Sequence, residues 1–256
     1  MKIVVAIKQV PERDAQVRIN PSGKWIEESG LQYALNESDA YALEEALQLK
    51  EKHGGEVIVV SAGPERVGQT IREALAKGAD RAIHIDCDDL GNRDALGVAR
   101  LLAAAVKPEN PDLVLTGLQS EDLGLGQTCV IVAELLNLPH ATLILHVEKT
   151  ETGLTVKREL EEGWFQTIDL PTPAVLTIQS GGNKLRYATL MGIKRAKTKE
   201  VRRVTAAELA VDATPVVILD QILLPHKQKS TQMLSGSPKE AAAALAEKLK
   251  FEVRVL

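Results

Sequence analysis

The sequence contains few cysteines, few aromatic residues and no long apolar run. Cys87 and Cys129 are its only cysteines, so neither a disulfide framework nor a cysteine zinc site can form. That usage fits a reducing compartment, and we expect a cytoplasmic protein. Aromatic residues make up 3% of the chain, too few for a platform that stacks single-stranded nucleic acid. No apolar run reaches the roughly 18 residues of a membrane span, so no membrane insertion is expected.

Charge is also close to balanced, which argues against a nucleic-acid partner. The chain has 31 Lys and Arg against 35 Asp and Glu, a net charge of -4. At 256 residues it can bury a core as one large or two small domains. The first apolar segment, residues 3–7, is interrupted at once by Lys8 and Pro11, so it predicts a strand rather than a secretory signal.

Short apolar runs alternate with amphipathic stretches through the first half of the chain. The runs predict strands at residues 3–7, 57–61, 82–85 and 113–116. The stretches between them predict helices at residues 39–52, 69–77, 94–105 and 127–136. Strands this apolar are buried on both faces, so the pattern indicates an α/β protein with a doubly wound, mostly parallel sheet.

The second half of the chain follows a different pattern. Alternating segments at residues 142–149 and 154–160 predict an added antiparallel hairpin, and residues 175–178 predict one more buried strand. Residues 179–203 are basic and lack a clear period, so we expect an exposed loop with at most a short helix. We divide the chain into a nucleotide-binding domain, residues 1–204, and a C-terminal arm, residues 205–256. The arm is expected to hold a short helix, a connector and an Ala-rich helix at residues 239–250.

Ligands of open α/β sheets bind where strands end and helices begin, and three loops qualify. They follow Ala6, residue 61 and residue 116, and the third, residues 117–128, contains three glycines before a helix. Gln127 and Thr128 stand where side chains meet unpaired helix amides. A phosphate would fit there, but a glycine-rich connector with a capped helix fits equally well, because neither GxGxxG nor a P-loop is present.

Catalytic and metal-binding patterns are lacking, so we expect a protein without substrate turnover of its own. The five histidines are scattered without ligand spacing, and no serine lies in a GxSxG turn. The acidic segment at residues 86–89 lacks further carboxylates at the spacing of a metal site, so it is interpreted as a solvated loop. Cys129 is interpreted as a small buried apolar residue.

A cluster of basic residues marks the segment after the last predicted strand of the sheet. Its members are Lys184, Arg186, Lys194, Arg195, Lys197, Lys199, Arg202 and Arg203. Residues 187–193 form an apolar island within it. Such an island either anchors in another protein's pocket while the charges orient the encounter, or folds back onto its own core. Composition does not separate these two interpretations.

Four segments of the chain resemble the beta subunits of electron transfer flavoproteins. They are residues 36–52 (NESDAYALEEALQLKEK), 61–80 (SAGPERVGQTIREALAKGAD), 117–128 and 185–197 (LRYATLMGIKRAK). The resemblance extends over essentially the whole chain. It implies a Rossmann-like fold of the adenine-nucleotide alpha-hydrolase type, paired with an alpha subunit that holds most of the FAD. It also implies a structural AMP in this subunit, and electron flow from flavoprotein dehydrogenases, such as those of fatty acid oxidation, to a quinone oxidoreductase.

By position, the resemblance also assigns site residues. Nucleotide contacts would be Ala6, Asn36, Glu37, Ser38, Asp39, Ala62, Gly117, Gln119, Asp122, Leu123, Gly124, Leu125, Gly126, Gln127 and Thr128. Docking of dehydrogenases would fall to a recognition loop at about residues 183–200, through Tyr187, Leu190, Met191, Ile193, Lys194, Arg195 and Lys197. Leu190 would enter an apolar pocket of the dehydrogenase. The C-terminal arm would pack on the alpha subunit.

Some positions depart from the family pattern. Ser38 and Arg13 replace aromatic residues that can approach the flavin, which leaves open whether this chain contacts the isoalloxazine ring. The loop sequence SEDLGLGQTC matches neither the housekeeping nor the electron-bifurcating type in full. AMP is favoured, a bifurcating subunit with a second FAD is the first alternative, and a free-standing ATP-binding stress-type protein is the second.

Overall fold

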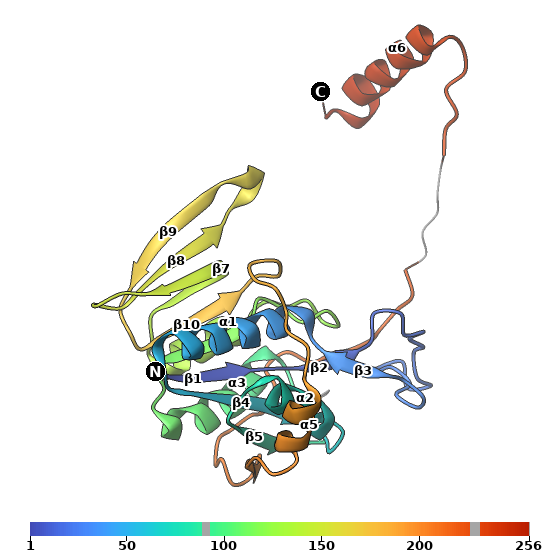
Figure 1. The fold of residues 1–256 in the computed structure, drawn as a ribbon. Coiled ribbons are helices and arrows are strands. Elements are labelled where there is room, and N and C mark those ends of the chain that lie inside the picture. Colours follow the sequence, from blue (N-terminus) through green and yellow to red (C-terminus); the bar gives the residue numbers. More distant parts are fainter. Residues whose placement is uncertain (89–92, 226–230, 256) are drawn as a thin grey trace. The chain divides into compact units, whose positions relative to one another are not determined.

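A computed structural model describes residues 1–88, 93–225 and 231–255 (Figure 1). The chain divides into two compact units, Met1–Ile222 and Leu223–Leu256. The first unit therefore continues past residue 204, where the sequence suggested a boundary. The reason is packing, because Ala206, Leu209 and Ala213 contact the apolar core of the first unit.

A nine-stranded sheet forms the centre of the first unit, in the order β11-β5-β4-β1-β6-β10-β7-β8-β9. Its parallel part contains β1 (Lys2–Ala6), β4 (Glu56–Gly63), β5 (Arg81–Asp86), β6 (Leu113–Gly117), β10 (Ala174–Ile178) and β11 (Val201–Thr205). The meander at one edge contains β7 (His140–Lys149), β8 (Leu154–Glu159) and β9 (Phe165–Leu170). β7 runs parallel to β10, and β8 and β9 are antiparallel to their neighbours. A separate pair joins β2 (Gln9–Pro11) to β3 (Tyr33–Leu35).

Helices cover both faces of the parallel strands, as the apolar runs predicted. The helices of the first unit are α1 (Glu37–His53), α2 (Val67–Lys77), α3 (Ala95–Val106), α4 (Thr128–Leu136) and α5 (Leu190–Ala196). The second unit contains α6 (Pro238–Lys248). Short turns are η2 (Lys107–Glu109), η3 (Glu161–Gly163) and η4 (Leu249–Val253). In β1, Ile3 and Val5 pack with α1 and α2, whereas Val4 packs with α3 and α4. Because alternate side chains of a strand point to opposite faces, every position of such a strand must be apolar.

The predicted fold class and the added antiparallel hairpin are confirmed, the hairpin as β7 and β8. Residues after 163 return as a third strand of this meander, β9, which was not predicted. Two local predictions are wrong. The segment expected to remain a loop through residue 203 forms β11, which pairs with β5. Arg202 and Arg203 can lie in this strand because Glu109, Glu65 and Asp86 neutralise them. The short helix expected after residue 205 is a series of turns over residues 206–210.

Candidate functional site

Three segments meet where β1 and β6 end: the residues after β1, the start of α1 and the loop after β6. Asp39, in the first turn of α1, links all three. Its Oδ2 accepts a hydrogen bond from the backbone N–H of Lys8 at 2.7 Å, and its Oδ1 accepts one from Gly117 at 2.9 Å. The side chain is buried, and that burial raises the pKa of Asp39 to about 7 despite both hydrogen bonds.

Asn36 and Ser38, just before Asp39 in the chain, hold the same loop. The Asn36 amide donates to the carbonyl of Gln119 at 3.0 Å, and its Oδ1 accepts from the N–H of Glu121 at 3.0 Å. The Ser38 hydroxyl donates to the Gln119 carbonyl at 2.8 Å. Both side chains are buried. The resemblance assigned these residues to a nucleotide, and the structure places their polar groups in hydrogen bonds to the loop.

Ion pairs hold the outer side of the loop. Lys8 Nζ lies 2.6 Å from Asp122 Oδ1, and Arg13 pairs with Glu37 at 2.7 Å and Glu121 at 2.9 Å. Burial acts against ionisation of Asp122, but the Lys8 ammonium and several hydrogen bonds keep the pKa of that carboxyl below its ordinary value. Arg13 therefore has carboxylate partners within this chain.

The loop of residues 117–128 is open where it approaches α4. Gly124 and Gly126 adopt left-handed backbone conformations with φ of 62° and 63°, which glycine adopts without steric cost. Gln127 precedes α4, but the cap expected from its side chain is not formed. Within the part of the chain that the structure describes, Gln127 thus leaves the first amides of α4 uncapped, at the positive end of the helix dipole.

Two predicted nucleotide contacts, Ala6 and Ala62, lie in the strands near this loop, and Cys129 lies in the first turn of α4. Ala6 ends β1 and Ala62 lies in β4, and both pack on the core under α3 and α4. Cys129 donates a weak S–H bond to the carbonyl of Gly117 at 3.8 Å. Burial raises the pKa of the Cys129 thiol to about 12, so it is not a nucleophile at neutral pH. Cys129 is half-buried, so the expectation of a fully buried residue is not met.

A second candidate site is the exposed end of α5. Thr189 caps the helix by accepting a hydrogen bond from the Gly192 N–H at 3.0 Å. Tyr187 and Leu190 are 92% and 88% exposed, and Met191 and Ile193 are exposed as well. The interpretation that this island folds back onto its own core is therefore wrong. Lys194, Arg195 and Lys197 are exposed around it.

The other side of α5 is fixed to α2. Ala196 is buried, and Arg72 Nη1 donates to its carbonyl at 2.6 Å and to that of Lys199 at 3.2 Å. The Lys199 ammonium reaches back to the carbonyls of Leu75 and Ala79. These bonds hold the apolar island on a defined helix.

Arg186 joins the segment before α5 to α1. Its Nε donates to Glu44 Oε2 at 2.7 Å and its Nη1 to Glu51 Oε1 at 2.6 Å. These hydrogen bonds raise the pKa of Arg186, so it stays charged. The sequence analysis did not identify Glu44 and Glu51 as partners of Arg186. They lie seven residues apart, on one face of α1, and this spacing could have indicated a shared partner.

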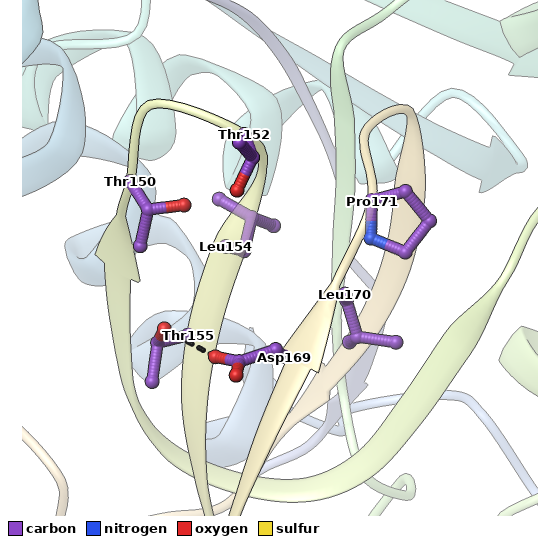
Figure 2. A pocket seen from close by; sticks show the side chains of 7 residues that line it. All are labelled: Thr150, Thr152, Leu154, Thr155, Asp169, Leu170 and Pro171. Carbon is purple, nitrogen blue, oxygen red and sulfur yellow. Dashed lines mark hydrogen bonds between the residues drawn. The ribbon is translucent and has the colours of Figure 1, made fainter.

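Two surface hollows lie apart from both candidate sites. The one in Figure 2 has a volume of about 430 Å³ and is lined by Thr150, Thr152, Leu154, Thr155, Asp169, Leu170 and Pro171. Asp169 there accepts a hydrogen bond from the Thr155 hydroxyl at 2.6 Å. The second, of about 510 Å³, lies beside α2 and includes Arg72, His84 and Arg203. Neither hollow is lined by a residue that the sequence analysis assigned to a site.

The residues that the structure describes contain neither a metal-binding cluster nor a helix that could span a membrane. Nowhere in residues 1–88, 93–225 and 231–255 do three or more His, Cys, Asp or Glu side chains gather as a metal site would require. Asp89, part of the acidic segment, lies outside those residues. In the same part of the chain, every helix is too short or too polar to cross a bilayer.

Comparison with known proteins gave consistent matches along the chain. A family described as the electron transfer flavoprotein domain matches residues 24–209. The electron transfer flavoprotein subunit beta of Methylophilus methylotrophus is 39% identical over 96% of this chain and 97% of that protein. The mitochondrial subunit beta of Oryza sativa subsp. japonica is 38% identical, and that of Bacillus subtilis 35% identical, each over the full length of both chains.

Proposed function

The chain belongs to the electron transfer flavoprotein family, and from that premise we propose that it is the beta-type half of a two-subunit electron carrier. An alpha-type subunit would hold most of the FAD, and this chain would support it. The absence of catalytic constellations in the sequence supports a carrier without substrate turnover of its own. The flavin supplies the redox chemistry when bound, and the residues of this chain hold the nucleotide loop and present the docking helix.

The observation that carries this proposal is the form of α5. Exposed apolar side chains are costly on a soluble surface unless a partner covers them. Here Leu190, the first residue of α5, and Tyr187, just before the helix, are almost fully exposed, and the opposite side of α5 is fixed by Arg72 and Ala196. An apolar anchor on a rigid support inside a basic rim is typical of a docking surface for an acidic partner. We assign docking of flavoprotein dehydrogenases, such as those acting on acyl-CoA, to this surface.

The loop of residues 117–128 is the proposed nucleotide site. Its glycines let a ligand approach the backbone, and the uncapped start of α4 offers N–H donors to a phosphate. We assign a structural AMP to it, with Ala6, Ala62 and residues 36–39 around it. Electrons would leave the carrier to a quinone oxidoreductase. We place the carrier in the cytoplasm, as the cysteine usage suggested.

The C-terminal unit is the proposed contact with the alpha-type subunit. α6 begins with a capping box between Ser237 and Glu240, and none of its residues is buried. Leu223 and Leu224 at the start of this unit are exposed, and so are Val216, Val217, Ile218 and Leu219 at the end of the first unit. So many exposed apolar side chains along one segment are best explained by a partner subunit that covers them.

A kinetic comparison of two leucine variants tests the docking role. Leu190→Ala should slow electron transfer from an acyl-CoA dehydrogenase by about tenfold or more, as expected for removing an apolar anchor. Flavin content should not change, because Leu190 contacts neither the nucleotide loop nor the core. Leu135→Ala, an exposed leucine on α4 at the opposite face of the sheet, is the matched control. Equal transfer rates for both variants would refute the docking role.

A further inference from the structure

Asp39 occupies the point where two neighbouring strands separate. β1 and β6 pair in parallel up to Ala6 and Thr116. Just beyond that pair, the Asp39 carboxylate receives one N–H from each side, from Lys8 after β1 and from Gly117 at the end of β6. Ligands of open α/β sheets bind in the crevice where adjacent strands diverge in this way.

The contact between α1 and the end of β6 is too close for any ligand atom to enter. A Cβ on Gly117 would lie 2.2 Å from the Ser38 hydroxyl and 2.3 Å from Asp39 Oδ1. Both carboxylate oxygens of Asp39 already accept a backbone hydrogen bond, and its side chain is 6% exposed. Asp39 therefore acts on a bound nucleotide through the backbone that it holds, without touching the nucleotide.

We propose that Asp39 is a positioning residue whose ionised carboxylate shapes the loop of residues 117–128. This proposal rests on the nucleotide site of the proposed function. An ionised carboxylate is a strong acceptor on each oxygen, whereas protonation turns one oxygen into a hydroxyl, which is a weaker acceptor for its N–H group. Protonation thus weakens one link. The end of β1 or of β6 is then held less tightly to α1, and the start of the nucleotide loop is less firmly fixed.

The charged groups around Asp39 place this change near neutral pH. Burial raises the pKa of Asp39 to about 7. The Lys8 ammonium favours the ionised form, but it is shared with Asp122. The nearby thiol of Cys129 stays protonated because burial raises its pKa. Glu37 and Glu121, on α1 and the loop, pair with Arg13.

Nucleotide release from the purified protein, with any partner subunit that copurifies, tests this role. The probe is AMP, and its release rate after dilution is measured between pH 5.5 and 8.5. In the unmodified protein, release should accelerate about tenfold as the pH falls through 7, because one charge-assisted hydrogen bond is lost. Asp39→Asn should release AMP at the fast rate throughout, since an amide keeps one acceptor and replaces the other by a donor.

Asp112→Asn is the matched control variant. Asp112 also accepts a backbone N–H at a strand end, from Lys2 at 2.7 Å, but at the amino ends of β1 and β6, opposite to the nucleotide loop. It should keep the release rate and the pH profile of the unmodified protein. An Asp39→Asn profile like that of Asp112→Asn would overturn the positioning role and leave the nucleotide site intact. A protein that binds no nucleotide at any pH would overturn the proposed site itself.

A second measurement does not depend on the folding of any variant. The amide proton shifts of Lys8 and Gly117 report directly on the carboxylate that accepts from them. Both should titrate together with a midpoint near 7 in the unmodified protein. Shifts that stay constant from pH 5.5 to 8.5 would overturn the role of the ionised form.

Discussion

Gly192 is the position where one added methyl group should displace the docking helix α5 without altering its exposed side chains. A Cβ there would lie 2.3 Å from the backbone carbonyl oxygen of Ala76 in α2. An ordinary contact needs about 3.5 Å, so α5 must move by roughly 1 Å. Overpacking of this kind costs about 1–3 kcal/mol. Alanine recovers up to about 1 kcal/mol as a better helix former, so we expect Gly192→Ala to lower the free energy of unfolding by up to about 2 kcal/mol.

Gly68→Ala provides the matched control in the neighbouring helix. Gly68 lies in the first turn of α2, and a Cβ there would meet nothing within 4 Å. The Gly68→Ala variant should leave the free energy of unfolding unchanged or raise it by up to about 1 kcal/mol. Denaturant unfolding gives the global effect, and hydrogen exchange at the amides of α5 gives the local one. Equal unfolding midpoints and equal exchange at α5 in both variants would refute the packing of α5 on α2.

Three further predictions concern other links of the structure. For Asp39, a native pKa of about 7 against an ordinary 3.8 means that the folded state binds more protons between these values, so stability falls as pH rises through this window. The unfolding free energy of Asp39→Asn relative to the unmodified protein should therefore rise by up to about 4 kcal/mol from pH 4 to 8, and a constant difference would contradict this. Arg186→Gln leaves the buried Glu44 without its cation and should cost about 1–2 kcal/mol in denaturant unfolding, since the pair is partly solvated, whereas an unchanged midpoint would exclude a stabilising pair. Truncation before Pro238 should impair copurification with the alpha-type subunit, and an intact complex after truncation would remove that role.

The central strands could be predicted because burial on both faces forces a continuous apolar run, as in residues 57–61. β11 could not be predicted in this way. It lies at an edge and carries Arg202 and Arg203, which are neutralised by Glu109, Glu65 and Asp86 from distant parts of the sequence. Local composition shows the basic charges and not their partners, so the segment looked like a solvated loop.

The candidate sites were predictable in position and not in detail. Strand ends located the loop of residues 117–128, because parallel strands share one carboxyl edge. The hydrogen bonds of Asn36 and Asp39 to that loop join residues far apart in sequence, so no local pattern reveals them. The exposure of Leu190 depends on the contact between Gly192 and Ala76, which is equally long-range.

The most direct test of the account is the identity of the nucleotide in this chain. The purified chain, separated from any copurifying partner, is denatured and the released molecule is analysed by mass spectrometry. We expect AMP to be released from this chain and FAD to be found only in the partner fraction. FAD released from this chain would contradict the AMP assignment and indicate a bifurcating type of subunit. Release of no nucleotide would contradict the proposed site at residues 117–128.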